Sequence, residues 1–238
     1  MGKKVKSFNI ICIIPARGGS KGIPNKNIID FCGKRLLQWT IEQAKASQYI
    51  NDVYVSSDSI KIRNIAADLN CYQIKRTMDI SGDTNSSESA LIHALSKIKI
   101  GQGGFVPDIV VFLQATSPLR TTKDIDNAIK TFIKGGYDSL FSACVMEDIL
   151  IWDKSKFNKK LFSVSYNYTN RQRRQDIKNR YVENGSIYIF KPEILIKNNN
   201  RLGGKIGMYV MDKWKMHEID DYDSLSICEH LMKTKILK

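Results

Sequence analysis

The sequence predicts an α/β fold in which a mostly parallel sheet has helices on both faces. Short apolar runs rich in β-branched residues alternate along the chain with longer segments that have helical spacing. Strands that alternate with helices in this way form parallel βαβ units. With 238 residues, the chain is long enough for one large domain of this class. We therefore expect a single domain over residues 1–238.

The expected elements begin with residues 10–14, a β-branched run that is typical of a buried strand and that Pro15 ends. In the segment 36–46, apolar side chains share one face of a helix. A further helix is expected to start at Pro192, since proline is favoured in the first helical turn. The remaining expected strands are 52–56, 71–74, 109–113, 139–145, 186–190 and 205–210, and the remaining helices are 61–69, 90–98, 122–134 and 225–236.

The segment 146–181 differs in character from the rest of the chain. Apolar spacing weakens there, while tyrosines and arginines accumulate, most densely at 170–176. We expect a small excursion from the sheet in this segment and not a second domain.

Composition narrows the classes of partner. The net charge of +13 fits either a nucleic-acid binder or an enzyme with an anionic substrate. The lysines are spread along the whole chain, which favours the anionic substrate and no nucleic acid. No apolar run is long enough to span a membrane, and the five scattered cysteines form no Cys-x-x-Cys pair. We expect a cytoplasmic protein with no membrane partner.

The loop at 15–27 carries the strongest chemical signal. Glycines let its backbone approach a ligand closely, and Arg17, Lys21 and Lys26 add positive charge. The loop has neither the Gly-x-x-x-x-Gly-Lys-Ser/Thr pattern of Walker ATPases nor a Gly-x-Gly-x-x-Gly run. A basic surface turn is the plainer alternative, but the spacing of the cations favours a site for a polyphosphate.

Two other loops are expected at the same edge of the sheet. Right-handed crossovers place the loops that follow parallel strands on one side, so 15–27, 76–89 and 114–120 should meet around one crevice. Asp58 also follows a strand, and we favour a helix cap over a ligand role for it. Ser86 or Ser87 is expected to cap the helix that starts nearby.

Near the carboxyl terminus, Glu218 and Asp220 lie on one side of an extended segment. Such a pair suits Mg²⁺, which proteins usually hold with one or two carboxylates plus phosphate oxygens and water. Asp221 and Asp223 are more typical of caps for the last helix.

Several of these stretches together resemble the acylneuraminate cytidylyltransferases. The stretches that carry the resemblance are Pro15-Ala-Arg-Gly-Gly-Ser-Lys-Gly-x-x-x-Lys-Asn27, Asp83-Thr-Asn-Ser-Ser87, Gln114-Ala-Thr-Ser-Pro-Leu-Arg120, Arg174-Gln175 with Asn184-Gly-Ser-Ile-Tyr188, and Glu218-Ile-Asp220. Ala115 stands where the family usually has proline, and Glu218 where it usually has aspartate. The matches follow the family's order over nearly the whole chain.

The resemblance implies a Rossmann-like three-layer nucleotidyltransferase fold and an activity that joins CTP to a nonulosonic, sialic-acid-type sugar acid, giving a CMP-sugar and pyrophosphate. It also implies Mg²⁺ as cofactor and a homodimer in which 146–181 serves dimerisation or substrate binding. Legionaminic, pseudaminic and 3-deoxy-octulosonic acids are alternative acceptors, and another nucleotide is an alternative donor. A basic nucleic-acid-binding protein is the remote alternative.

Site residues follow from the same resemblance. Arg17, Lys26 and Asp220 are expected to be catalytic, and Glu218 joins Asp220 at the metal. Arg120 is expected either to pair with Asp124 or to contact substrate. The expected nucleotide contacts are Ala16, Arg17, Gly18, Ser20, Lys21, Lys26, Asn27, Arg76, Ser86 and Ser87, with Asn27 reading the cytosine; the expected sugar contacts are Gln114, Thr116, Ser117, Arg174 and Tyr188.

Overall fold

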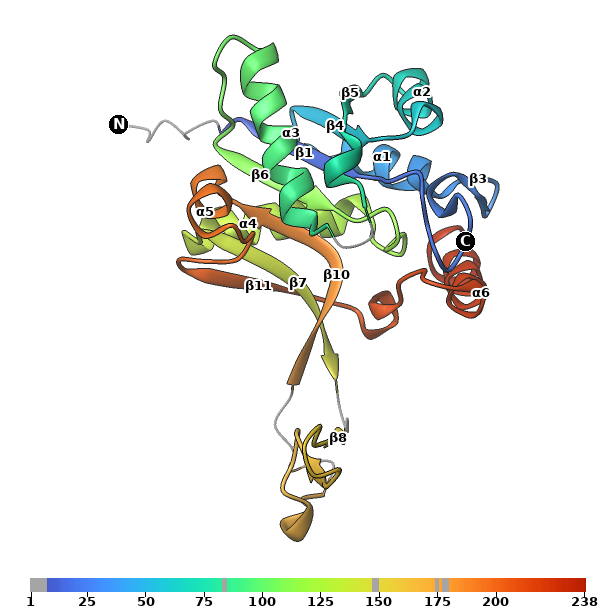
Figure 1. The fold of residues 1–238 in the computed structure, drawn as a ribbon, viewed down its shortest axis with the longest axis vertical. Coiled ribbons are helices and arrows are strands. Elements are labelled where there is room, and N and C mark those ends of the chain that lie inside the picture. The colour runs from blue at the N-terminus through green and yellow to red at the C-terminus, as the bar shows by residue number, and fades with distance from the viewer. Residues whose placement is uncertain (1–7, 83–84, 147–149, 174–175, 177–179) are drawn as a thin grey trace.

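The computed structural model describes residues 8–82, 85–146, 150–173, 176 and 180–238. Its centre is a seven-stranded sheet with the order β11-β7-β10-β6-β1-β4-β5 (Figure 1). All neighbouring strands are parallel except for β10, which runs antiparallel to both β6 and β7. The α/β class and the mostly parallel sheet are thus confirmed. The strands are β1 Ile10–Pro15, β4 Asp52–Ser57, β5 Tyr72–Lys75, β6 Ile109–Leu113, β7 Ser139–Met146, β10 Arg180–Phe190 and β11 Ile206–Met211.

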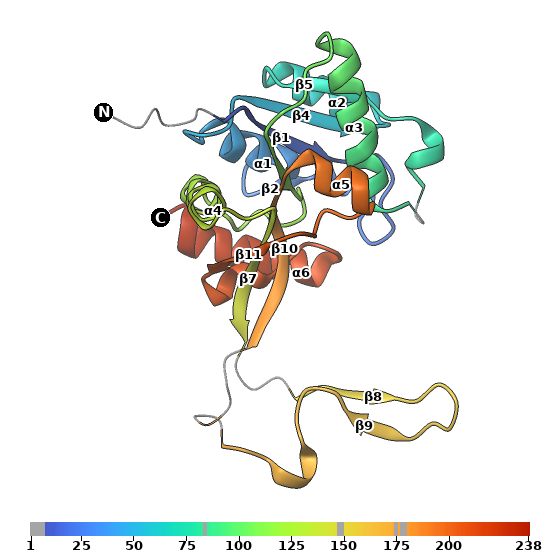
Figure 2. The same cartoon turned by 90° about the vertical axis from the view of Figure 1, so that its left-hand side faces the viewer.

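Helices cover both faces of this sheet (Figure 2). Successive residues of β1 point to opposite faces, so Cys12 and Ile14 pack under α1, α2 and α4, while Ile11 and Ile13 pack under α3 and α5. This arrangement explains why β1 is apolar throughout. The helices are α1 Leu36–Lys45, α2 Ile60–Asp68, α3 Ser87–Gly101, α4 Thr122–Gly135, α5 Pro192–Asn198 and α6 Tyr222–Leu231, the last continued by a π-helical segment at Met232–Ile236.

Helix starts agree with most of the cap expectations. The Ser86 side chain accepts a hydrogen bond from the Ser89 amide and caps α3, and Pro192 lies in the first turn of α5. Asp221 caps α6 through a reciprocal pair with Ser224. Asp223 lies inside the first turn of α6 and is not its cap, so that part of the expectation was wrong.

The sequence pattern missed several features, among them a short hairpin and the start of β10. A short hairpin, β2 Asp30–Phe31 with β3 Lys34–Arg35, follows the glycine-rich loop. Strand β10 starts at Arg180, six residues before its apolar stretch, because residues 180–183 pair with β7 while both their faces are exposed to solvent. Exposed pairing leaves no hydrophobic alternation to detect.

Beyond the ends of β7 and β10, the chain forms a second small sheet, β8 Trp152–Lys154 with β9 Leu161–Ser163 (Figures 1 and 2). Large apolar side chains of this hairpin face solvent, and Phe157 is fully exposed. We call residues 150–170 the arm. In the part of the chain that the structure describes, no helix has the length and apolar character to cross a membrane.

A separate apolar cluster connects the glycine-rich loop to the carboxyl-terminal helix. Ile23 from the loop and Ile219 from the segment before α6 are both buried in it, together with Cys228 and Met232 of the carboxyl-terminal helical segment. This cluster fixes the segment 218–220 beside the loop 15–27, although almost two hundred residues separate them in sequence.

Candidate active site

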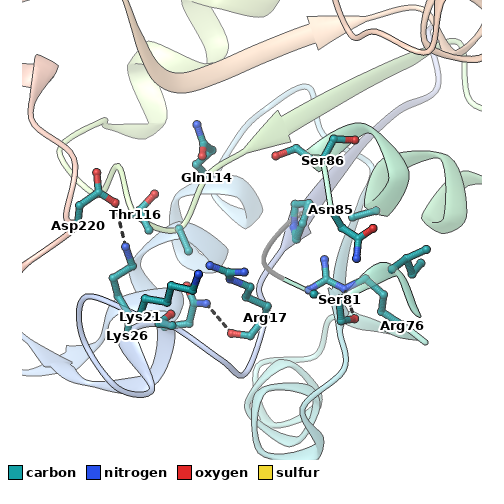
Figure 3. A pocket seen from close by; sticks show the side chains of 18 of the residues that line it. Arg17, Lys21, Lys26, Arg76, Ser81, Asn85, Ser86, Gln114, Thr116 and Asp220 are labelled. Atoms are coloured by element: carbon teal, nitrogen blue, oxygen red, sulfur yellow. Dashed lines mark hydrogen bonds and ion pairs between the residues drawn. The ribbon is translucent and has the colours of Figure 1, made fainter. Parts of the chain in front are cut away.

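A cavity of about 460 Å³ opens where β1 and β6 end, within the size range of about 300–1,000 Å³ common for ligand sites (Figure 3). Its walls come from the loop after β1, the segment from Arg76 to α3, the end of β6 and the segment before α6. The lining residues are Pro15, Arg17, Ser20, Lys21, Gly22, Lys26, Asn27, Arg76, Ile80, Ser81, Gly82, Asn85, Ser86, Ser87, Ala90, Phe112, Gln114, Ala115, Thr116, Glu218 and Asp220.

Positive charge gathers on one side of this cavity. Arg17, Lys21 and Lys26 come from the loop after β1, and Arg76 follows β5 (Figure 3). The Arg76 side chain is only 6% exposed, and its Nε donates to the Ser81 hydroxyl at 3.1 Å. Burial lowers the pKa of Arg76, and the neighbouring charge of Arg17 lowers it further. Four cations around one cavity form a site for a polyanion.

The loop after β1 keeps its shape through contacts with its own backbone and with the segment before α6. The side-chain amide of Asn27 donates to the Arg17 carbonyl at 2.9 Å. A Cβ atom at Gly22 would lie 2.0 Å from the Asp220 carbonyl oxygen, so only glycine fits there. Asn27 therefore supports the loop as well as lining the cavity.

The carboxylates come from the segment before α6, which packs against the cationic loop. Ile219 is fully buried, so Glu218 and Asp220 on either side of it point toward the cavity, as the alternation predicts. The Ile219 amide donates to the Thr116 carbonyl at 2.8 Å, which ties the segment to the end of β6. Lys26 Nζ lies 2.7 Å from the Ile219 carbonyl oxygen and 3.0 Å from Asp220 Oδ1. The cationic loop and the acidic pair thus touch directly.

Glu218 and Asp220 have different surroundings. Burial raises the pKa of Glu218, and the negative charge of Asp220 raises it further, while Ser117, Lys26 and Arg120 act in the opposite direction. The Asp220 side chain is 77% exposed. Two carboxylates on one cavity wall are suitable oxygen donors for Mg²⁺. The described residues contain no cluster of three or more His, Cys, Asp or Glu side chains.

Gln114 lies at the end of β6, where its side-chain amide donates to the Gly185 carbonyl at 2.7 Å. Gly185 has a φ of +64°. A Cβ atom there would lie 1.7 Å from Glu218 Oε1 and 2.7 Å from Gln114 Nε2. Strand β10 shifts its register between Glu183 and Tyr188, and this irregularity brings Gln114 and Glu218 together only because residue 185 has no side chain.

Four expected contacts do not line the cavity. Ala16 is buried and its amide donates to the Ser56 carbonyl. The Gly18 amide points to Asp58, Ser117 is 2% exposed, and the Tyr188 hydroxyl binds the Glu183 carboxylate.

Arg174, like Asp83, lies outside the described residues. The remaining expected residues are brought together around the cavity; they are Arg17, Ser20, Lys21, Lys26, Asn27, Arg76, Ser86, Ser87, Gln114, Thr116, Glu218 and Asp220.

The cap expected at Asp58 was wrong. Ser59 is the N-cap residue of α2 and makes no side-chain cap bond, while Asp58 Oδ1 accepts from the Gly18 amide at 3.0 Å and lies 3.6 Å from Arg76 Nη2. Sequence gave no signal for this contact, because the chain brings residues 18, 58 and 76 together only when β1, β4 and β5 pair.

Arg120 fits neither of its two expected roles. It is fully buried and donates to the carbonyls of Gln114 at 2.9 Å and Ser117 at 2.6 Å, and to the Thr40 hydroxyl at 2.7 Å. Burial lowers its pKa to about 10. The Asp124 carboxylate instead binds Lys215 Nζ at 2.9 Å. Arg120 thus fixes the turn that carries Gln114 and Thr116.

Sequence reasoning missed several lining residues, among them Ser81, Asn85 and Phe112. Ser81 and Asn85 belong to the polar loop before α3, so its general polarity was the available signal. Phe112 reads as an ordinary core residue of a buried strand, and nothing in its spacing indicates a cavity wall.

A family model described as cytidylyltransferase matches residues 11–237. The chain is 32% identical to the post-translational flagellin modification protein B of Campylobacter coli, over 96% of this chain and 97% of that one. It is 34% identical to N-acylneuraminate cytidylyltransferase A of Danio rerio over 92% of its length, but spans only 49% of that protein. It is 29% identical to pseudaminic acid cytidylyltransferase of Campylobacter jejuni, over 94% of this chain and 96% of that one.

Two solved structures share the fold. CMP:2-keto-3-deoxy-manno-octonic acid synthetase complexed with CTP matches with a TM-score of 0.70 at 16% identity, over 96% of this chain and all of that one. A 4-diphosphocytidyl-2C-methyl-D-erythritol synthase matches with a TM-score of 0.69 at 10% identity, over 94% of this chain and 98% of that one. At such low identity, these likenesses establish the fold class alone.

Proposed function

Because this chain belongs to the cytidylyltransferase family, we propose that it joins CTP to a nonulosonic, sialic-acid-type sugar acid and releases pyrophosphate. The expected family and the enzymatic class are confirmed. The observation that carries the proposal is the division of one cavity into a wall of four cations and a wall with two carboxylates, Gln114 and Thr116. A triphosphate matches the first wall, and a hydroxylated acceptor matches the second.

In the proposed reaction, Arg17, Lys21, Lys26 and Arg76 bind the triphosphate and neutralise its charge. Asn27 lies at the base of the loop, where it would contact the cytosine. Gln114 and Thr116 would donate and accept hydrogen bonds with sugar hydroxyls. With both substrates held, the anomeric hydroxyl oxygen of the sugar forms a bond to the α-phosphorus. The hydroxyl proton is released to water, the bond from that phosphorus to the oxygen that bridges it to the β-phosphorus breaks, and pyrophosphate leaves with the electron pair.

Catalysis in this scheme is positioning and charge neutralisation, as phosphoryl transfer generally requires. Glu218 and Asp220 are the residues that would hold Mg²⁺. When bound, the ion would lower the negative charge of the phosphates and of the attacking oxygen. Lys26 contacts Asp220 directly, so the loop and the metal-binding segment are positioned together. We assign Arg17, Lys26 and Asp220 as the residues closest to the reacting atoms.

The identity of the acceptor sugar acid is proposed from the relatives of this chain. N-acylneuraminate and pseudaminic acid enzymes are both among the relatives, so pseudaminic, legionaminic and 3-deoxy-octulosonic acids are the alternatives to a sialic acid. The test measures pyrophosphate release with each of the four nucleoside triphosphates against a panel of these sugar acids. We expect release with CTP and one nonulosonic acid, abolished by EDTA and restored by Mg²⁺. No release with CTP and any acid of the panel would contradict the proposal.

We further propose a homodimer in which the arm packs against a second copy. The arm exposes Trp152, Leu161 and Phe162 at 43%, 67% and 47%, which is unfavourable for an isolated chain in water. Sedimentation equilibrium should give twice the mass of 27.1 kDa.

A cytoplasmic location is consistent with five unpaired cysteine thiols, four of them buried.

A further inference from the structure

The Asp58 carboxylate does not line the cavity but contacts two parts of its cationic wall, where simple electrostatics would not place a negative charge. Asp58 follows β4, and its side chain is 15% exposed. Its Oδ1 atom accepts from the Gly18 amide at 3.0 Å and lies 3.6 Å from Arg76 Nη2. A negative charge at this place repels a triphosphate. Its presence therefore calls for a compensating role.

The backbone around Asp58 is itself held firmly. Arg63, one turn into α2, donates through Nη1 to the carbonyls of Ser57 and Asp58, each at 2.9 Å. The loop approaches this segment so closely that a Cβ atom on Gly18 would lie 2.9 Å from Ser59 Cβ. Asp58 thus projects from a fixed helix start and reaches the first turn of the phosphate-binding loop.

Arg76 depends on the same carboxylate. Burial and the nearby Arg17 both lower the pKa of Arg76, whereas Asp58 acts in the opposite direction and favours the charged form. The Arg76 amide donates to the Ser57 carbonyl at 3.0 Å, and its Nε donates to Ser81. Asp58 on one side and Ser81 on the other therefore fix the direction of the guanidinium.

We propose that Asp58 is a positioning residue of the nucleotide site, which holds the Gly18 turn and the Arg76 guanidinium in the geometry that a triphosphate needs. The inference rests on the proposed function. If Asp58 has this role, its negative charge weakens triphosphate binding by less than the ordering of the Gly18 turn and Arg76 strengthens it. Removal of the charge should then weaken nucleotide binding, which is the opposite of the simple electrostatic expectation.

The test is calorimetric binding of CTP to the full chain and to Asp58→Asn, which keeps the shape and an oxygen acceptor for Gly18. We expect the Kd for CTP to rise about tenfold, the size typical of one charge-assisted contact. The KM for CTP should rise in parallel, while kcat and the KM for the sugar acid change by less than about threefold. Asp68→Asn, at the far end of α2, is the matched control and should bind CTP as the parent does.

A double-mutant cycle between Asp58 and Arg76 distinguishes a positioning role of Asp58 from a general structural role. In an Arg76→Gln background, Asp58→Asn should weaken CTP binding by less than about threefold, because asparagine still accepts from Gly18 and the charged partner Arg76 is already gone. Equal effects in both backgrounds, unchanged binding, or tighter binding by Asp58→Asn would each overturn the inference. If the parent protein binds no nucleoside triphosphate, the proposed function itself fails. Thermal unfolding verifies that each variant is folded at the assay temperature. If Asp58→Asn is not, Asp58→Ser, which also removes the charge and keeps an oxygen acceptor, takes its place with the same expected result.

Discussion

Replacement of Lys26 by methionine provides the sharpest separation of stability from function at this site. The ammonium group lies 2.7 Å from the Ile219 carbonyl oxygen and 3.0 Å from Asp220 Oδ1. The ion pair contributes only about 0–1 kcal/mol to the free energy of unfolding, because the Asp220 side chain is 77% exposed. The hydrogen bond to Ile219 is charge-assisted and partly buried and adds about 1 kcal/mol. We expect Lys26→Met to lower the free energy of unfolding by about 1–2 kcal/mol, or Tm by about 2–8 °C.

Activity should fall much further than stability. A positive donor lost from a developing phosphoryl charge costs about 100- to 1,000-fold in kcat. The assay is pyrophosphate release at saturating CTP and sugar acid, paired with thermal unfolding of the same preparation. Lys34→Met is the matched control: Lys34 also pairs with a carboxylate, Glu42, but lies away from the cavity, so full activity is expected. Activity of Lys26→Met within about threefold of the parent would refute the assignment.

Three further substitutions test the geometry. Gly185→Ala should reduce kcat at least about tenfold, because the new methyl group occupies the place of Glu218 Oε1. It should also lower the free energy of unfolding by about 1–3 kcal/mol, because the backbone φ at this residue is positive. A fully active variant would contradict the assigned geometry. Arg120→Met should cost about 2–6 kcal/mol in urea unfolding, because the buried carbonyls of Gln114 and Ser117 each lose a donor and an unsatisfied buried group costs about 1–3 kcal/mol. A loss below about 1 kcal/mol would show that the turn holds without Arg120. Hydrogen bonds from Lys191 and the Lys205 amide lower the pKa of Asp138 in the folded protein. The ionised Asp138 carboxylate therefore stabilises the fold above pH 3.8, and this stabilisation is lost as the pH falls through the lowered pKa. Asp138→Asn should therefore lower Tm at pH 7 but not near pH 2, whereas a Tm difference independent of pH would exclude the carboxylate charge as the cause.

Local pattern was enough for most of the fold. The β-branched run at 10–14 became β1, and the apolar face of 122–134 became α4, because both signals arise from burial that repeats with the period of the element. The start of β10 escaped, since residues 180–183 pair with β7 without burying a face. Strand pairing without burial leaves no trace in hydrophobicity.

The candidate site residues also fall into those that a local sequence pattern indicates and those that it does not. Arg17, Lys21, Lys26, Glu218 and Asp220 are recognisable because charge and glycine cluster locally in the sequence, and the structure brings all five to one cavity. Their assignment to catalysis and metal binding stays a prediction. The hairpin at 30–35 and the cavity wall formed by Phe112 had no comparable local signal.

Patterns along the chain predicted the α/β class, the order of the elements and which loops carry the charged groups, because each depends on neighbouring residues. The partners of Asp58, Arg120 and Lys26 became known from the folded chain, since each of these residues contacts another that lies 40, 80 or 194 residues away in sequence, respectively. Side chains so far apart meet through strand pairing and through the apolar cluster around Ile219. A long-range contact of this kind depends on the whole packed fold, so no local pattern encodes it.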